Sequence, residues 1–140
     1  MTSVFELHPQ LAADCEVVAD LPLCRALLSK DSLYPWLILV PRRAGVREIF
    51  ELTSADQQQL MRESNALSKA MAEFFNADKM NVAALGNMVP QLHIHHIVRY
   101  RTDSAWPKPV WGVAETQPYD QNTLNAMLES IKKLLAGLDV

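Results

Sequence analysis

The chain has 140 residues, of which 49% are hydrophobic and 21% are charged, and its formal net charge at pH 7 is −3. This length suffices for one domain, residues 1–140, whose core needs no metal or disulfide to hold it. The acidic balance disfavours a non-specific nucleic-acid binder, and no apolar run approaches the roughly 18 residues that span a membrane. We therefore expect neither nucleic acid nor membrane as a partner.

The N-terminal residues Met1–Leu7 have neither the basic start nor the apolar stretch of a secretion signal. The two cysteines, Cys15 and Cys24, are too far apart for a Cys-x-x-Cys motif. Free thiols in a reducing compartment are the default state for such a chain. We therefore expect a cytoplasmic protein without a disulfide.

The first elements of the chain are expected to be short. Residues Val4–Ala13 fit a short helix that Pro9 interrupts. Apolar runs of strand length follow, with a turn at Pro22 between the first two. The three expected strands are Glu16–Asp20, Leu23–Leu28 and Trp36–Val40.

A long helix is expected next. Ser54–Gln57 has the pattern of a capping box, in which the serine hydroxyl and the glutamine three residues later satisfy free backbone N–H groups. Apolar residues follow at helical spacing and predict one buried face. They are Leu60, Leu67, Met71 and Phe74.

The second half of the chain predicts two more strands and a C-terminal helix. The strands are expected at Met80–Leu85 and Leu92–Val98, with a break at Gly86. Asp120 is the expected N-cap of the helix. The apolar face of this helix is expected to contain Leu124, Leu128, Ile131, Leu135 and Leu138. This order of elements favours an α+β domain with an antiparallel sheet and its helices on one face.

The stretch Val89–Tyr100 holds three of the four histidines of the chain. Side chains alternate between the two faces of a strand, so Gln91, His93 and His95 share one face. Arg99 continues the same row. Two imidazoles, an amide and a guanidinium are poor core material, and the row therefore predicts a functional surface.

The segment Gln91-Leu92-His93-Ile94-His95-His96-Ile97 resembles the signature of the histidine triad (HIT) superfamily of nucleotide hydrolases and transferases. That signature is His-φ-His-φ-His-φ-φ, where φ is apolar. Glutamine replaces the first histidine here, and His96 takes one apolar position. The flanking sequences Leu85–Pro90, Arg99–Tyr100 and Trp106–Trp111 resemble one bacterial branch of the family. Upstream, Pro35–Arg42 resembles a strand of the family that ends in a Pro-Arg or Pro-Lys turn, and Ile49–Thr53 resembles the entry to its long helix.

The resemblance implies a fold and an assembly. The family has an α+β fold with a five-stranded antiparallel sheet, a long central helix and a C-terminal helix. Its members are usually homodimers whose sheets join edge to edge, so we expect a homodimer here.

His93 and His95 are the main catalytic candidates. His93 matches the central histidine of the family, which attacks the α-phosphorus of a nucleotide and forms a nucleotidyl-histidine. A neutral imidazole is nucleophilic near pH 7, and its phosphoramidate is labile to water. His95 matches the third histidine and lies about 7 Å further along the strand. As an imidazolium it could stabilise charge on the phosphate or help to protonate the leaving group.

Gln91 is the third catalytic candidate, because it replaces the first histidine of the triad. An amide can bond a phosphate or orient an imidazole, but it carries no proton in acid–base chemistry. The related hexose-1-phosphate uridylyltransferases have glutamine at a different triad position and still transfer nucleotides. Asn87 and Arg99 are the candidate substrate-binding residues; a turn asparagine and a solvated strand-end arginine are the ordinary alternatives.

Other residues near the motif have open roles. Trp36 lies where many relatives carry another histidine, and packing or lining of a base pocket both fit it. Trp106 and Trp111 fit either stacking on a base or closing a dimer. His96 faces away from the triad and is expected to pack against a helix. A basic cluster could attract a polyanion or simply be solvated; it contains Arg42, Arg43 and Arg47.

We therefore expect a HIT-type enzyme, with hydrolase favoured over transferase, that uses neither a metal nor another cofactor. Its substrate would be a nucleoside phosphoramidate or a dinucleoside polyphosphate, attacked at the α-phosphate through a covalent intermediate on His93. The alternative is a nucleotide-binding module that has lost turnover through Gln91. A metal site at His93, His95 and His96 is disfavoured, because strand alternation turns His96 away.

Overall fold

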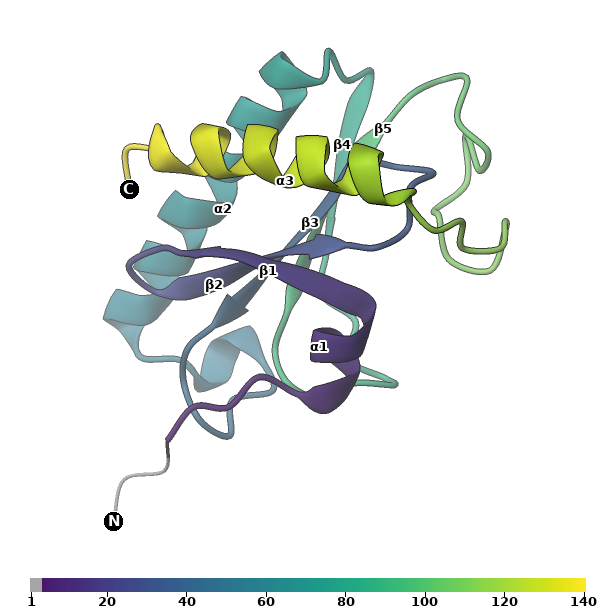
Figure 1. Ribbon diagram of the computed structural model, residues 1–140. Helices are drawn as coiled ribbons and strands as arrows, with labels where there is room; N and C mark the ends of the chain where they lie inside the picture. The colour runs from purple at the N-terminus through teal and green to yellow at the C-terminus, as the bar shows by residue number, and fades with distance from the viewer. Residues whose placement is uncertain (1–3) are drawn as a thin grey trace.

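The computed structural model describes residues 4–140, so the expectation for a secretion signal lies partly outside the described residues. Five strands form one antiparallel sheet in the order β1-β2-β3-β5-β4 (Figure 1). They are β1 (Cys15–Asp20), β2 (Cys24–Ser29), β3 (Trp36–Pro41), β4 (Lys79–Ala83) and β5 (Ile94–Arg99). The helices are α1 (Pro9–Asp14), α2 (Ser54–Phe74) and α3 (Gln121–Ala136), with a 3₁₀ turn, η1 (Ile49–Glu51). The predicted α+β class and five-stranded antiparallel sheet are confirmed.

Both long helices cover the same face of the sheet, and α3 crosses the strands at an angle to α2 (Figure 1). Leu67 of α2 and Ile131 of α3 belong to one buried cluster with Leu37 and Leu39 of β3. The short helix α1 lies on the opposite face, where Leu11 packs with Ile38. This second face is the one that carries the histidine row.

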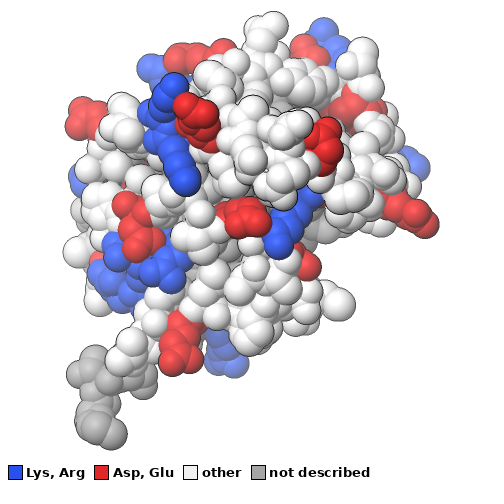
Figure 2. Space-filling view, viewed as in Figure 1, with Lys and Arg blue, Asp and Glu red and all other residues white. Residues whose placement is uncertain are grey.

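The character of the helices and the distribution of surface charge are relevant to the predictions that neither membrane nor nucleic acid is a partner. Within residues 4–140, none of the helices combines the length and the apolar character that crossing a membrane requires. Figure 2 shows acidic and basic side chains interspersed over the face that carries α3 in this view.

The N-terminal helix begins later than expected. It starts at Pro9, and the Nδ1 atom of His8 caps it by accepting from the backbone N–H of Gln10 at 3.1 Å. Proline lacks an N–H and has a fixed φ, so it suits the first turn of a helix and does not interrupt this one. The expected helix over Val4–Ala13 is therefore wrong in its start.

The N-cap of α2 lies one residue before the expected serine. Thr53 is the cap, and its hydroxyl accepts from the N–H of Asp56 at 3.1 Å. Gln57 bonds the carbonyl of Leu52 instead of closing a box with Ser54. The helix buries Leu60, Leu67 and Met71 as predicted. Phe74, in the last turn, was also expected on the buried face but is exposed.

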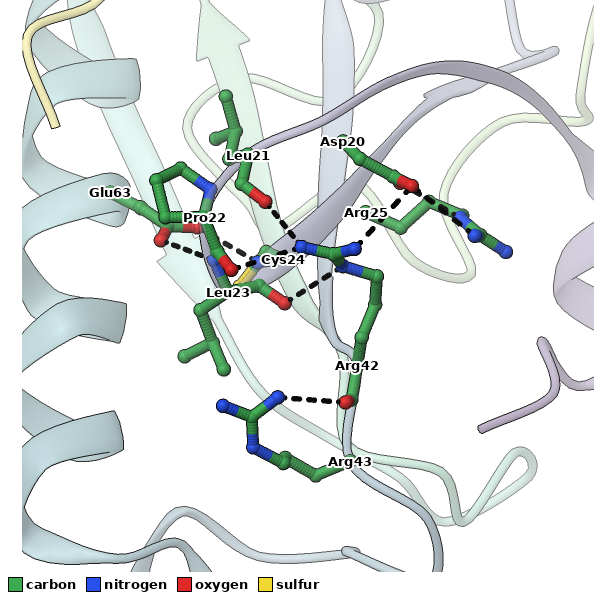
Figure 3. Close-up of polar contacts among 9 residues, drawn as sticks. All are labelled: Asp20, Leu21, Pro22, Leu23, Cys24, Arg25, Arg42, Arg43 and Glu63. Atoms are coloured by element: carbon green, nitrogen blue, oxygen red, sulfur yellow. Dashed lines mark hydrogen bonds and ion pairs between the residues drawn. The ribbon is translucent and has the colours of Figure 1, made fainter. Parts of the chain in front are cut away.

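A buried carboxylate ties α2 to the turn between β1 and β2 (Figure 3). Glu63 is fully buried and accepts from the backbone N–H groups of Leu23 and Cys24 at 2.8 and 2.9 Å. Gln59 donates a third hydrogen bond to it at 2.8 Å. Arg42 holds the same turn from outside by donating to three backbone carbonyls. The carboxylate is satisfied by three donors, as a buried charge requires.

Candidate active site

His93 and His95 lie together on the α1 face of the sheet. His93 immediately precedes β5, and His95 lies within it, paired across the sheet with Ile38 of β3. Their ring centroids are 4.9 Å apart, and the two residues are only 6% and 7% exposed. The strand alternation predicted from the sequence thus brings the two imidazoles side by side.

The tautomer of His93 follows from the hydrogen bond at its Nδ1 atom. Its Nδ1 atom lies 2.7 Å from the backbone carbonyl oxygen of Gln91. A carbonyl oxygen can only accept, so Nδ1 carries the hydrogen. In the neutral ring the lone pair is therefore on Nε2, the nitrogen left free for chemistry.

The opposite tautomer is imposed on His95. The indole Nε1–H of Trp36 donates to Nδ1 of His95 at 3.0 Å, so the hydrogen of this ring is on Nε2. Burial, together with the smaller effects of the neighbouring His93 and His96, lowers the pKa of His95 to about 3. His95 is thus neutral at pH 7 in the unliganded protein, and the imidazolium expected from the sequence is not its resting state.

The side chain of Gln91 does not point into the histidine row. Its Oε1 accepts from the backbone N–H of His8, and its Nε2 donates to the carbonyl of Glu6, both at 2.9 Å. The amide is therefore bonded at both ends to the segment that precedes α1. Gln91 reaches His93 only through its backbone carbonyl.

The two predicted substrate-binding residues are not brought to the histidines. Arg99 is 2% exposed, and Asp103 accepts two hydrogen bonds from its guanidinium at 2.8 and 3.0 Å. A third bond joins it to Asn81. The guanidinium is thus held inside the protein, and the substrate-binding role predicted for Arg99 has no structural support. Asn87 lies exposed in the turn after Gly86 and lines neither of the cavities that adjoin His93.

Two cavities meet at His93. The first, here called the His95 cavity, has a volume of about 370 Å³; its lining includes Lys30, Asp31, Trp36, His93, His95 and Trp111. The second, here called the Arg47 cavity, has a volume of about 320 Å³; its lining includes Arg47, Phe50, Gln57, Gly86, Gln91 and His93. Both volumes are in the range of small-molecule sites.

The lining of the His95 cavity contains residues that the sequence did not point to. Lys30 and Asp31 follow the end of β2, and no short motif marks them. For Trp111 the sequence allows stacking on a base or closing a dimer; its ring centroid lies 5.0 Å from that of His95 and 5.8 Å from that of Trp36. The irregular segment that carries Trp111 is anchored at its start by Asp103, which accepts from the N–H of Trp106 at 2.8 Å.

His96 packs against α2, as predicted. Its Nε2 lies 2.7 Å from the hydroxyl of Ser64, and its Nδ1 lies 3.1 Å from the carbonyl of Ile94. Burial lowers the pKa of His96 to about 4. Among the residues that the structure describes, no three His, Cys, Asp or Glu side chains come together as a set of metal ligands.

Two of the three arginines of the basic cluster, Arg42 and Arg43, form hydrogen bonds within the protein. Arg42 bonds backbone carbonyls of the β1–β2 turn, and Arg43 forms a bidentate pair with Asp56 at 2.7 and 3.1 Å. Arg47, whose guanidinium is 3.9 Å from Glu51, is the member that lines a cavity next to His93.

Comparison with known proteins gives a family match and close structural neighbours. The HIT domain model matches residues 10–102. A histidine triad protein from Marinobacter aquaeolei VT8 is 52% identical, with 98% of this chain and 100% of that chain covered and a TM-score of 0.94. One from Bradyrhizobium japonicum is 43% identical, with 95% and 99% covered and a TM-score of 0.92.

More distant likeness extends to a hypothetical histidine triad nucleotide-binding protein from Sulfolobus tokodaii. It is 13% identical, with 87% of this chain and 84% of that chain covered and a TM-score of 0.66, and this likeness shows the fold alone. No curated protein matched the chain. The family match and the two close neighbours show that the chain belongs to the HIT domain family, a superfamily of nucleotide hydrolases and transferases.

Proposed function

We propose that the protein is a nucleotide hydrolase that attacks the α-phosphate of its substrate with Nε2 of His93. The observation that carries this proposal is the bond between Nδ1–H of His93 and the carbonyl of Gln91. This bond directs the lone pair of the ring to Nε2. It also leaves an acceptor beside Nδ1–H when the ring becomes positively charged after attack.

The reaction proceeds in two steps. In the first, Nε2 of His93 forms a bond to the α-phosphorus, and the bond from phosphorus to the leaving group breaks with its electron pair on the leaving group. In the second, a water oxygen attacks the same phosphorus and the lone pair returns to Nε2. The products are a nucleoside monophosphate and the leaving group, and the water proton passes to solvent. His95 supports both steps by donating Nε2–H to a phosphoryl oxygen.

The His95 cavity is our candidate for the nucleoside. Trp36 and Trp111 supply aromatic surface beside the histidines, and Asp31 and Lys30 supply polar groups at the cavity wall. Aromatic surface with a few polar groups is typical of sites for small ligands.

The test is the intact mass of the protein, quenched early after mixing with diadenosine tetraphosphate or with adenosine 5′-phosphoramidate. The wild type is expected to gain the mass of one adenylyl group transiently and to release AMP, and His93→Ala is expected to do neither. His8→Ala is the matched control, because His8 lies outside both cavities that adjoin His93. Release of AMP by His93→Ala at the wild-type rate would refute the assignment.

A binding module without turnover is the second candidate. It is favoured by the replacement of a titratable histidine with Gln91 and by the low exposure of His93 and His95. Binding of AMP by calorimetry, with no adduct and no product from either substrate, would select this candidate over the hydrolase.

We also propose that the protein is a homodimer in a reducing, cytoplasmic compartment. Within residues 4–140, β4 is an edge strand bonded only to β5, and its Val82 side chain is 50% exposed. The two cysteines are buried and free, in keeping with a reducing compartment. Light scattering coupled to gel filtration tests the assembly, and Val82→Lys is expected to shift the mass to that of one chain.

A further inference from the structure

We infer that Trp36 fixes His95 as a neutral hydrogen-bond donor, and that the site therefore selects substrates whose leaving group departs without gaining a proton. Phosphate and polyphosphate are leaving groups of this class, whereas amines are not. This inference rests on the proposed function and narrows its substrate class to nucleotides joined to a second phosphate.

The hydrogen bond between Trp36 and His95 is compatible with only one protonation state of the imidazole. An indole nitrogen can only donate, and it is 3.0 Å from Nδ1 of His95. A second proton on the imidazole would place two N–H groups against each other, with His95 almost wholly buried. The hydrogen bond between the two rings would then be lost and two buried N–H groups would face each other unpaired, which is costly.

Trp36 is held in place from several sides. It lies on β3 and pairs with Ile97 of β5. The rings of Tyr34 and Trp111 contact it edge-on, with centroids 6.4 and 5.8 Å away. The indole therefore has little freedom to rotate away from His95 and release Nδ1.

Among residues 4–140, no carboxylate pairs with His95 and so stabilises a second proton on its ring. Of the titratable neighbours, His93 has its ring 4.9 Å away, and His96 faces the other side of the sheet. Asp14, Lys30 and Asp31 line the same cavity. Asp31 accepts from the backbone N–H groups of Leu33 and Gln117, and among residues 4–140 His95 forms no ion pair with a carboxylate.

The neutral state of His95 limits which leaving groups can depart from phosphorus. Neutral His95 keeps its Nε2–H while donating to a phosphoryl oxygen, because losing that proton would leave an imidazolate. A departing phosphate takes the electron pair of the P–O bond as an anion that is stable near pH 7, since its second pKa is about 6. A departing amine needs a proton on nitrogen as the P–N bond breaks, and His95 in this tautomer does not supply one.

The first experiment is to determine the tautomer of His95 in the unliganded wild-type protein by ¹⁵N NMR. We expect an unprotonated Nδ1 and a protonated Nε2 from pH 5 to pH 8. A protonated Nδ1, or titration of the ring between pH 5 and pH 8, would overturn the inference. This measurement needs no variant and no substrate.

The second experiment compares kcat/KM for diadenosine tetraphosphate and adenosine 5′-phosphoramidate at pH 6. The wild type is expected to prefer the polyphosphate. Trp36→Phe leaves Nδ1 free to take up a proton as Nε2–H is given to a departing amine, so the preference is expected to shift toward the phosphoramidate by tenfold or more, through kcat. One general acid commonly contributes roughly 100-fold or more.

The matched control is Trp111→Phe, which also removes an indole near His95 but not the bond to Nδ1. It is expected to leave the tautomer and the ratio of the two substrates unchanged, whatever its effect on binding. An unchanged ratio in a folded Trp36→Phe variant would overturn the inference, as would a wild type that prefers the phosphoramidate. Absence of turnover with both substrates would instead contradict the proposed function, and the tautomer measurement would still stand.

Discussion

The backbone carbonyl of Gln91 lies 2.7 Å from Nδ1 of His93, while the side-chain amide of the same glutamine is bonded to the segment before α1. One residue therefore links the N-terminal segment to the proposed nucleophile. The replacement of histidine by glutamine at this position changes the side chain without removing the contact that orients His93.

Removal of the Gln91 amide is expected to affect stability more than chemistry. Gln91→Ala loses two hydrogen bonds to the backbone of Glu6 and His8, and we expect the free energy of unfolding to fall by about 1–2 kcal/mol. Urea denaturation measures this, with the exposed Gln10→Ala as control. If Gln91→Ala abolishes the adenylyl adduct and leaves stability unchanged, the side chain acts in the chemistry itself.

The pair of Arg99 and Asp103 is expected to make the protein sensitive to acid. Burial raises the pKa of Asp103, but hydrogen bonds from Arg99 and from backbone N–H groups outweigh this and lower the pKa to about 2. A carboxyl with a depressed pKa contributes stability above its unfolded-state pKa, near 3.8. We expect this contribution to fade as pH falls from about 4 to about 2.

Asp103→Asn tests this dependence. The variant leaves the buried guanidinium of Arg99 without its counter-charge, and we expect a loss of about 3–5 kcal/mol at pH 7. Chemical denaturation between pH 2 and pH 7 should show the gap between wild type and variant narrowing toward pH 2. A constant gap over this range would show that the charge of Asp103 is not the source of the stability.

Ser64 is expected to stabilise His96 in its neutral form. In Ser64→Ala the Nε2 atom of a fully buried imidazole loses its partner, and we expect a cost of about 1–3 kcal/mol. Burial lowers the pKa of His96 to about 4, so the folded protein favours the neutral ring. The stability that neutral His96 contributes is therefore present above pH 6.5 and is lost as pH falls from 6.5 to about 4. Thermal unfolding measures both effects, with Ser68→Ala on the same helix as control; equal melting temperatures for the two variants would contradict the assignment.

Glu63→Gln tests the anchor between α2 and the β1–β2 turn. The amide offers one acceptor where the carboxylate offers two, so the N–H of either Leu23 or Cys24 faces another donor. We expect the free energy of unfolding to fall by about 1.5–3 kcal/mol, the range for hydrogen bonds to a charged group. Glu73→Gln, exposed on the same helix, is the control, and a loss of similar size there would show a general charge effect on α2.

The order and class of the elements follow from the sequence because apolar periodicity records which face each element buries. The cap of α3 at Asp120 was predicted for the same reason of local chemistry, and its carboxylate accepts from the N–H of Thr123 at 2.8 Å. The cap of α2 was misplaced by one residue because adjacent Thr53 and Ser54 can both accept such a bond. Local pattern does not decide between them.

The parts of the site that were not predicted depend on contacts between distant segments. Alternation places Arg99 on the face of His93 and His95, but Asp103 and Asn81 determine that it is buried. Trp111 reaches His95 through a segment without periodicity, so no pattern in the sequence could place it. The tautomer of His95 likewise needed the position of an indole from another strand.

The three imidazoles near β5 have a common property that bears on proton transfer. A carbonyl fixes the hydrogen of His93 on Nδ1, an indole fixes that of His95 on Nε2, and the carbonyl of Ile94 fixes that of His96 on Nδ1. Each neutral ring has a single N–H, and giving that proton to a neighbour would leave an imidazolate, so a proton relay along the strand is unfavourable. Protons needed or released during turnover have to travel through solvent in the two cavities, so the rate should respond to the buffer and to heavy water through bulk exchange rather than through an internal relay.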